Sequence, residues 1–280
     1  MARGADLHLH SSYSDGTFTP REVVAQAARQ QVSPIALTDH DTVAGIPEAL
    51  QAGVEMSVEV IPGVELSAHE EGHDIHIIGY FIEWEAPKLQ RSLDALAERR
   101  LKRVNEIVKR LTDLGCPICL EDVQAVAGHG TISRRHVARV LVSQGYARSI
   151  SKAFDFYLAP GKPAHVDPVG FSSLDAIDLI GHAQGISALA HPMRSKALSM
   201  LPHLVNQGIK GLEVYHPSHT TEDIFILAKY AHQHNLIITG GSDSHGEGTG
   251  GSRIGNITLP QKYADDIKKC GEHIRKTSRK

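Results

Sequence analysis

The fold is decided by residues 5–41, which run ADLHLHSSYSDGTFTPREVVAQAARQQVSPIALTDHD. β-rich runs at Ala5–Leu9 and Pro34–Thr38 flank a stretch with helical periodicity at Pro20–Gln30. A strand, a helix and a second strand in this order are typical of a βα unit built around a parallel sheet. The stretch therefore predicts an α/β fold.

The same alternation continues along most of the chain. Further strands are expected at Val58–Ile61, His73–Phe81, Ile186–Ala190, Gly211–Tyr215 and Leu236–Thr239. Further helices are expected at Ile46–Gly53, Leu89–Leu114, Leu174–Gln184, Thr221–Gln233 and Ala264–Lys276. Strands that alternate with helices indicate a mostly parallel sheet covered by helices.

The middle of the chain interrupts this alternation. From Pro87 to about Val166, helical patterns follow one another without a convincing strand. The first of them is charged and amphipathic, and Leu101 is one of its apolar residues at helical spacing. We therefore expect a helical insertion at residues 88–165 and an α/β body at residues 1–87 and 166–280.

Composition excludes several classes of protein. The 280 residues carry a formal net charge of −3 and are 41% hydrophobic, which argues against disorder and against a coiled coil. The sequence contains no run of about 18 apolar residues, so no transmembrane helix is expected. The start of the chain is polar and lacks the apolar core of a signal peptide. We therefore expect a cytoplasmic protein with no membrane partner, and the near-neutral charge gives no overall basic surface for nucleic acid.

Polar side chains gather where the predicted strands end. The chain has 18 histidines, and the strand-end motifs are Asp6-Leu-His-Leu-His10, Thr38-Asp-His-Asp41, Gly63-Val-Glu65, Ala190-His-Pro192 and Ser242-Asp-Ser-His245. The C-terminal ends of parallel strands meet at one edge of an α/β sheet. We therefore expect these side chains to build one site.

The residue types in these motifs favour a metal centre. His8 and His10 lie two residues apart on an extended strand, so both imidazoles point to one face. Asp243 and His245 have the same spacing, and Glu65 is placed to bridge two ions. Mixed imidazole and carboxylate ligands suit Zn, Mn or Fe.

Each motif alone has a structural explanation as well. A His-x-His pair occurs often by chance, His40 could be a turn residue, and His76 could be a core histidine inside an apolar strand. The joint occurrence of five strand-end motifs favours the metal centre over these separate explanations.

Taken together, the motifs resemble the polymerase and histidinol phosphatase (PHP) family. The resemblance spans nearly the whole chain, and its segments occur in the family order: Asp6-Leu-His-Leu-His10, Ser14-Asp-Gly16, Thr38-Asp-His-Asp41, Gly63-Val-Glu65, His76-Ile-Ile-Gly79, Ala190-His-Pro192 and Ser242-Asp-Ser-His245. It implies a distorted (β/α)7 barrel that holds two or three divalent metal ions and hydrolyses phosphoesters.

The resemblance also implies a set of ligands for each ion. The three sets are His8, His10, Glu65 and Asp243; Glu65, His76 and His191; and Asp15, His40 and His245. Many family members have a histidine where this chain has Asp15, so the third set is where the chain departs from the pattern. Mn is the expected ion, with Fe, Zn or Mg as alternatives.

A motif in the expected insertion resembles one branch of the family, which acts on nucleoside 3′,5′-bisphosphates and on 5′-phosphorylated RNA ends. The segment Thr131-Ile-Ser-Arg-Arg-His136 contains Arg134 and His136, for which this branch implies phosphate contact. Lys162 and His219 are further candidates for substrate binding. Arg134, His136 and His219 are the candidate catalytic residues, and either histidine could protonate the leaving group. Without the resemblance, Arg134 would be assigned to a solvated helix face and Lys162 to an exposed loop.

The resemblance predicts an enzyme. It would be a metal-dependent phosphoesterase that removes the 3′-phosphate of nucleoside 3′,5′-bisphosphates. By cleaving the same type of bond, it would also trim short 5′-phosphorylated RNA from the 5′ end. The alternatives are a histidinol phosphatase-like phosphomonoesterase acting on a small metabolite, and a non-catalytic metal-binding PHP module. A phosphorylated nucleotide or short RNA is the expected partner, and no obligatory protein partner is inferred.

Overall fold

The computed structural model of the protein describes residues 4–70, 72–195, 197–247 and 251–278. Within these residues, seven strands form one sheet in which they lie in chain order. The strands are β1 (Asp6–Leu9), β2 (Ile35–Leu37), β3 (Val60–Glu70), β4 (His73–Tyr80), β5 (Ile186–Leu189), β6 (Gly211–Tyr215) and β7 (Ile237–Gly240). The α/β class predicted from the sequence is confirmed, and every predicted strand has its counterpart.

The sheet is mostly parallel, with one antiparallel strand in its middle. β1, β2 and β3 pair in parallel, as do β5, β6 and β7, whereas β4 runs antiparallel to both of its neighbours. Only two residues separate β3 from β4 in the sequence, and so short a connection can join only antiparallel strands. β3 continues to Glu70, beyond the predicted Val58–Ile61. The prediction ended too early because the polar residues Glu65 and Ser67 interrupt the apolar pattern of the strand.

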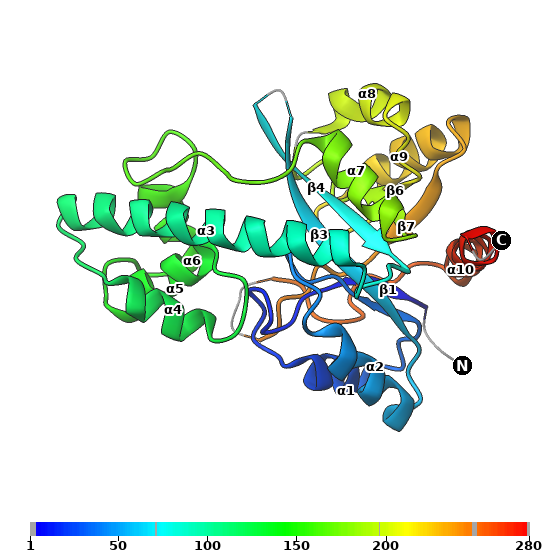
Figure 1. Ribbon diagram of the computed structural model, residues 1–280, viewed down its shortest axis with the longest axis horizontal. Helices are drawn as coiled ribbons and strands as arrows, with labels where there is room; N and C mark the ends of the chain where they lie inside the picture. Colours follow the sequence, from blue (N-terminus) through cyan, green and yellow to red (C-terminus); the bar gives the residue numbers. More distant parts are fainter. Residues whose placement is uncertain (1–3, 71, 196, 248–250, 279–280) are drawn as a thin grey trace.

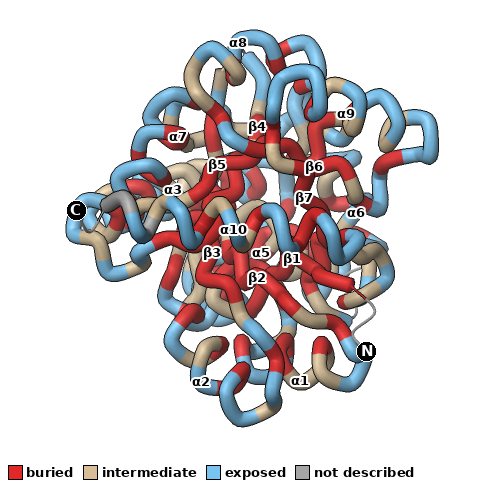
Figure 2. The backbone as a smooth tube through the Cα atoms, turned by 90° about the vertical axis from the view of Figure 1, so that its right-hand side faces the viewer, coloured by how far each residue is buried: buried red, intermediate tan, exposed pale blue. Residues whose placement is uncertain are grey.

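The first strand lies beside the segment that follows the last strand. Leu9 forms an isolated parallel bridge with Ser244, and the His10 amide donates to the Ser244 carbonyl oxygen at 3.0 Å. Gly241 permits this approach, because a Cβ there would lie 2.4 Å from the His8 nitrogen. The sheet is therefore curled, and the carboxyl ends of its parallel strands face a common centre. Figure 2 shows the strands as buried tube surrounded by helices with exposed outer faces.

Helices cover the outer side of the curled sheet. They are α1 (Pro20–Gln30), α2 (Ile46–Met56), α7 (Ser173–His182), the 3₁₀-helix η2 (Ala197–Met200), α8 (Leu201–Asn206), α9 (Thr221–Gln233) and α10 (Gln261–Ser278). Local sequence explains their starts, as in α1: the Thr19 side chain accepts from the Glu22 amide, the Glu22 carboxylate accepts from the Thr19 amide, and Pro20 occupies the first turn. Valines and alanines on the inner face of α1 pack in the core.

A group of helices between β4 and β5, here called the helical arm (residues 87–158), projects to one side of the sheet (Figure 1). It contains α3 (Pro87–Asp113), α4 (Leu120–Ala127), α5 (Arg134–Ser143), α6 (Ile150–Ala153) and the π-helix η1 (Phe154–Leu158).

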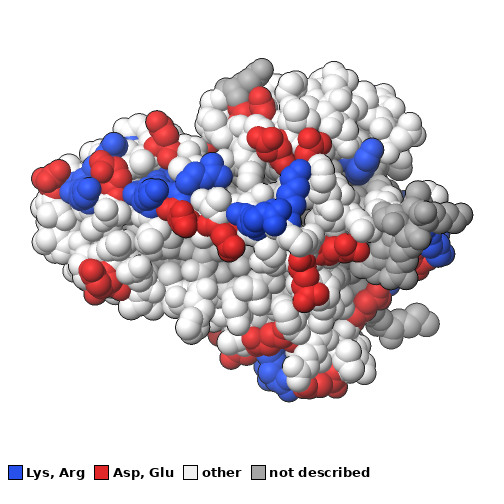
Figure 3. Space-filling model, viewed as in Figure 1, with Lys and Arg blue, Asp and Glu red and all other residues white. Residues whose placement is uncertain are grey.

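The long helix α3 belongs to two hydrophobic cores. Leu89 and Leu93 pack in the core of the sheet, whereas Ile107 and Leu111 pack in a separate core made by the arm. Leu101, predicted on the apolar stripe, is 38% exposed and belongs to neither core. Acidic and basic side chains are interspersed along the outer face of α3 (Figure 3). Among the described residues, no helix has the length and hydropathy needed to cross a bilayer.

Candidate metal centre and active site

All nine side chains predicted as metal ligands lie around the centre of the curled sheet. β1 supplies His8, and the segment directly after it supplies His10 and Asp15. The remaining six come from the ends of other strands or from within them: His40, Glu65, His76, His191, Asp243 and His245. Asp243 is thereby brought into contact with His8 and His10, which lie more than 230 positions away in the sequence.

The most buried group surrounds one carboxylate oxygen. The Glu65 Oε2 atom lies 3.2 Å from His8 Nε2 and 3.3 Å from His10 Nε2. Asp243 Oδ1 lies 3.1 Å from the same nitrogen of His10. One ligand atom from each of these four residues lies within 4.8 Å of the others, and all four residues are buried.

The other oxygen of Glu65 faces a second pair of histidines. Glu65 Oε1 lies 2.8 Å from His76 Nδ1 and 3.0 Å from His191 Nε2. One carboxylate thus contacts two sets of imidazoles through its two oxygens.

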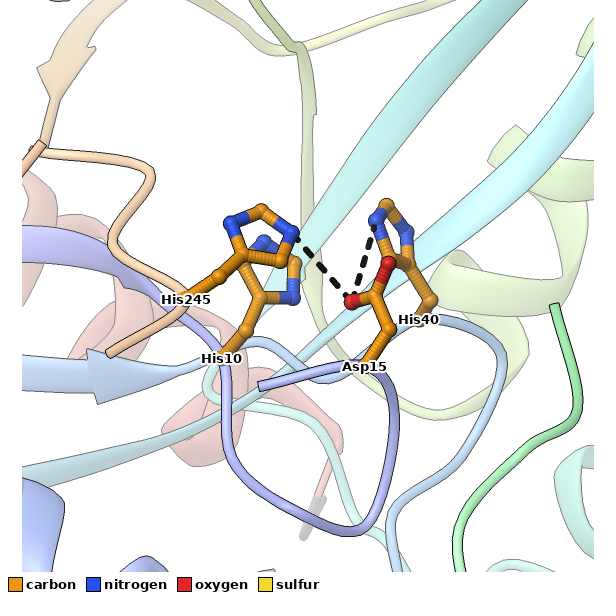
Figure 4. Close-up of side chains that lie close together, drawn as sticks. All are labelled: His10, Asp15, His40 and His245. Atoms are coloured by element: carbon orange, nitrogen blue, oxygen red, sulfur yellow. Dashed lines mark ion pairs between the residues drawn. The ribbon is translucent and has the colours of Figure 1, made fainter. Parts of the chain in front are cut away.

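A third group forms around Asp15. Asp15 Oδ1 lies 3.2 Å from His245 Nε2 and 4.0 Å from His40 Nε2, and His10 lies close enough to complete the set (Figure 4). Hydrogen bonds to Asp39 hold the loop that carries Asp15. The Asp39 carboxylate accepts from the Ser11 and Ser14 hydroxyls, each at 2.6 Å. The aspartate at this position therefore reaches its two predicted histidine partners.

The donor set fits divalent metal ions. Many of the buried atoms at the centre have no hydrogen-bond partner: His8 Nε2, His10 Nδ1 and Nε2, Asp15 Oδ1, His40 Nδ1, Glu65 Oε2 and His191 Nδ1. Unpartnered buried polar atoms are costly, and imidazole nitrogens and carboxylate oxygens that converge are a ligand set for a metal such as Zn, Mn or Fe.

Charge supports the same conclusion. Burial raises the pKa of Glu65 and of Asp243, but the surrounding histidines outweigh it and hold both pKa values well below their usual range. The buried anions in turn raise the pKa of His10 to about 9, although its burial acts in the opposite direction. The centre is therefore built to hold positive charge.

Two of the predicted ligands have unusual backbone conformations. His191 has a backbone φ of 28° and Asp243 a backbone φ of 50°, values that residues other than glycine rarely adopt. Such conformations gather at functional sites, where surrounding contacts hold them.

The metal-binding side chains open into a cavity of about 200 Å³ that the helical arm helps to line. Its walls carry the predicted ligands His40, His76, His191 and His245 and, from the arm, Arg100, Arg103, Arg134 and Arg135. Burial, together with the neighbouring guanidinium groups of Arg134 and Arg100, lowers the pKa of Arg103 to about 9. Basic residues crowded beside a metal centre make a cavity suited to an anion with more than one charge.

Comparison with known proteins agrees with this geometry. A family model described as PHP domain matches residues 6–271. The chain belongs to the PHP domain family.

Relatives of this PHP chain include two bacterial enzymes of similar length. It is 35% identical over 257 residues to the 3′,5′-nucleoside bisphosphate phosphatase of Chromobacterium violaceum, with 90% of each chain covered. It is 38% identical over 247 residues to the 5′-3′ exoribonuclease Rnm of Escherichia coli, covering 86% of this chain and 84% of the relative. Among solved structures, a Bifidobacterium adolescentis protein assigned as a metal-dependent phosphoesterase matches with a TM-score of 0.89 and 30% identity over 97% of both chains. The PHP chain is therefore a phosphoric ester hydrolase with a centre for divalent metals.

The four residues predicted to contact substrate have different surroundings in the PHP chain. Arg134 lines the cavity, where it lies 3.8 Å from Asp74 and over the ring of Phe154. His136 is buried behind it, and its Nδ1 accepts from the Ser133 amide at the start of α5.

Lys162 and His219 lie elsewhere. Lys162 is exposed in the loop after η1 and is not one of the described residues that line the cavity. His219 is buried against His216, and its Nδ1 bonds to the Val214 carbonyl oxygen at 2.9 Å. The neighbouring His216 is the histidine of this loop that reaches the predicted ligand Asp243, at 3.4 Å.

Sequence reasoning missed one carboxylate that supports two ligands. Glu213 of β6 is fully buried, and its side chain accepts from the His8 ring Nδ1 at 2.9 Å and from the His191 amide at 2.7 Å. Burial raises the pKa of Glu213, but the charge of His8 and its hydrogen bond outweigh it and lower the pKa. A carboxylate behind a histidine ligand fixes its tautomer and ring orientation. The available signal was a lone glutamate in an otherwise apolar strand.

Proposed function

We propose that this PHP protein hydrolyses the 3′-phosphoester of nucleoside 3′,5′-bisphosphates and of short 5′-phosphorylated RNA. The observation that carries the proposal is the cavity that joins the metal-binding side chains to Arg100, Arg103 and Arg134. A substrate with two phosphoryl groups can place one at the metal centre and the other against these arginines. The nucleotide and RNA substrates in the names of its relatives agree with this choice.

Two or three divalent ions would occupy the centre, with Mn as the first choice and Fe, Zn or Mg as alternatives. The three predicted ligand sets would hold them, and Glu65, whose two carboxylate oxygens face different histidines, would belong to the first two. When bound, the ions would act as Lewis acids on the phosphoryl group and lower the pKa of the attacking water. The (β/α)7 barrel implied by the family would present them at the carboxyl ends of its strands.

The residues of the chain have definable tasks in this reaction. Water adds its oxygen to phosphorus, the bond between phosphorus and O3′ breaks, and O3′ takes up a proton. Arg134 binds the 5′-phosphate with its paired N–H donors and thereby orients the 3′-ester towards the ligand cluster. His136 positions Arg134, because it holds the first turn of α5 through Ser133.

The helical arm contributes to the proposed substrate-binding cavity. We propose that residues 88–165 form an insertion that covers the active site of a body made by residues 1–87 and 166–280. Support comes from the separate hydrophobic core of the arm and from the arginines that it contributes to the cavity.

A direct test incubates the Mn-loaded protein with adenosine 3′,5′-bisphosphate and separates the products by chromatography. Adenosine 5′-monophosphate and inorganic phosphate in equal amounts are expected. If the protein has bound metal and yet does not turn over this substrate, the nucleotide assignment is wrong. Hydrolysis of histidinol phosphate would then favour the small-metabolite alternative.

A second test separates nucleotide from metabolite use. Arg134→Ala is expected to lower kcat/KM for the bisphosphate about 10- to 100-fold, since a hydrogen bond to a charged group is worth about 1.5–3 kcal/mol. The same change should scarcely affect adenosine 3′-monophosphate, which lacks the 5′-phosphate. Arg91→Ala on the exposed side of α3 serves as the matched control. Equal losses on both substrates would remove Arg134 from 5′-phosphate recognition.

A further inference from the structure

A second groove adjoins the catalytic cavity. It has a volume of about 820 Å³ and lies between the helical arm and the loops around Thr17 and Arg194. Arg135, Phe154 and Arg194 line both hollows, so the groove continues directly from the metal centre. The proposed function gives this continuation no task.

The start of α5 separates the two basic regions. The consecutive residues Arg134 and Arg135 turn to different partners: Arg134 to Asp74 on β4, and Arg135 to Asp15 beside the third ligand group. A substrate bound with its 5′-phosphate at Arg134 would cross the metal centre. Anything attached beyond the scissile phosphate would then leave on the side of Arg135.

The groove is basic where it meets the metal centre. Arg135, Arg139 and Arg194 line it. Each already makes one polar contact: Arg135 Nε with the Asp15 carboxylate at 3.2 Å, Arg139 with the Asp15 carbonyl oxygen at 2.6 Å, and Arg194 with Asp243 at 2.5 Å. A guanidinium has five N–H donors in a fixed fork, so each side chain retains donors for a phosphodiester.

The other walls suit the remaining parts of a nucleotide. Phe154 and Ile150 supply ring and aliphatic surface, and Ser143, Ser149 and Ser151 supply hydroxyl groups. Aromatic side chains that stack bases and basic side chains that follow the backbone are the usual means of binding single-stranded nucleic acid. Asp155, the acidic residue among the described residues of this wall, is paired with Lys152 at 3.0 Å.

We infer that this groove binds the nucleotides of a single-stranded RNA that follow the scissile phosphate. The inference rests on the proposed function, and it deepens it, because a nucleoside bisphosphate ends at that phosphate and cannot enter the groove. The groove therefore distinguishes RNA from a mononucleotide at a site that handles the same bond in both.

The test changes the charge of the groove at Ser151, which is exposed and lies in the first turn of α6. For each variant, kcat/KM is measured with a 5′-phosphorylated RNA trinucleotide and with adenosine 3′,5′-bisphosphate. Ser151→Glu is expected to lower the ratio of RNA to bisphosphate activity about fivefold, which is the effect of one charge at about 4 Å in water. Ser151→Lys should raise the ratio by a similar factor.

A matched control places the same charges elsewhere on the arm. Ala125 is exposed on α4 and outside the groove, so Ala125→Glu and Ala125→Lys should leave the ratio unchanged. In the wild type, RNA hydrolysis should also decline more steeply with salt than in Ser151→Glu, because salt screens the repulsion between the added carboxylate and the phosphates.

The outcomes separate the two proposals. If the wild type hydrolyses the bisphosphate but the Ser151 variants keep its substrate ratio, the groove assignment is wrong and the proposed function stands. If neither substrate is hydrolysed, the proposed function fails, and fluorescence anisotropy with a labelled 5′-phosphorylated RNA decides the groove separately. Binding that is equal in Ser151→Glu and Ser151→Lys would overturn the inference.

Discussion

Replacing Glu213 with glutamine is expected to weaken the binding of divalent metal about 10- to 100-fold, which is the usual effect of removing a partner behind a ligand. The Glu213 carboxylate accepts two hydrogen bonds, from His8 Nδ1 and from the His191 amide. A carboxamide has only one oxygen, so one of the two donors would face an NH₂ group instead. His8 and Glu213 are both fully buried, and water cannot take the lost place without rearrangement.

The magnitude follows from these two contacts. With the carboxylate present, His8 carries its proton on Nδ1 and directs Nε2 towards Glu65 and Asp243. A tenfold change in affinity corresponds to about 1.4 kcal/mol, so the expected range is about 1.4–2.8 kcal/mol. The lower value applies if the amide oxygen keeps the bond to His8, and the higher value if the ring also turns.

The assay is calorimetric titration of the metal-free protein with Mn²⁺. Glu222→Gln, an exposed position on the neighbouring helix α9, is the matched control and should bind like the wild type. Thermal melting of the metal-free variants shows whether each has folded. Wild-type affinity in a folded Glu213→Gln protein would refute the assignment of Glu213 as the residue that orients His8.

Three further predictions concern other parts of the structure. Burial is the main cause that lowers the pKa of His136 to about 4, from about 6.5 in the unfolded chain. Protonation therefore favours unfolding, so the contribution of His136 to stability is complete above about pH 6.5 and is lost as the pH falls towards 4, by up to about 3 kcal/mol. His136→Gln keeps a capping-box residue three positions after Ser133, and melting curves between pH 4 and 6.5 should show a shallower loss than in the wild type; parallel curves would contradict this. Gly241→Ala is expected to destabilise the protein by about 1–3 kcal/mol, because the new Cβ would meet the His8 backbone nitrogen, and a denaturant midpoint equal to that of the wild type would show that β1 moves aside freely. Asp15→Asn removes the charged oxygen beside His40 and His245, so the metal content of the protein by mass spectrometry should fall below that of the wild type, and an unchanged content would exclude Asp15 as a ligand.

The sequence was most informative where chemistry and secondary structure coincide. The strand-end motifs placed His8, His10 and Glu65 in one site, because polar residues that follow short apolar strands gather at one edge of an α/β sheet. The sequence was less informative about β3. Glu65 and Ser67 interrupt its apolar pattern, although the strand continues to Glu70. Local patterns do not show which neighbour a strand will pair with.

The supporting residues were harder to predict. Glu213 is marked locally only as a lone glutamate in an apolar strand, and its partners His8 and His191 lie 205 and 22 positions away, so its task is not readable from the sequence around it. Arg100 and Arg103 have the same pattern as the solvated charges on the rest of α3, and only the packing of the arm turns them to the cavity. Such roles arise from tertiary contacts, which spacing along the chain does not encode.

The membership of α3 in two cores has a consequence for protein engineering. Arg100 lies between them, donating to Asp41 and to Ser67 of the sheet and to the Ile132 carbonyl of the arm. Arg103 likewise ties α3 to the returning chain at Val166. The helix α3 is therefore a rigid element common to the arm and the sheet, and the two should unfold together as one cooperative unit. A chimera that exchanges arms between relatives should include all of α3 and its returning segment, because a junction within this helix would separate the arginines from the carboxylate and carbonyl oxygens that hold them.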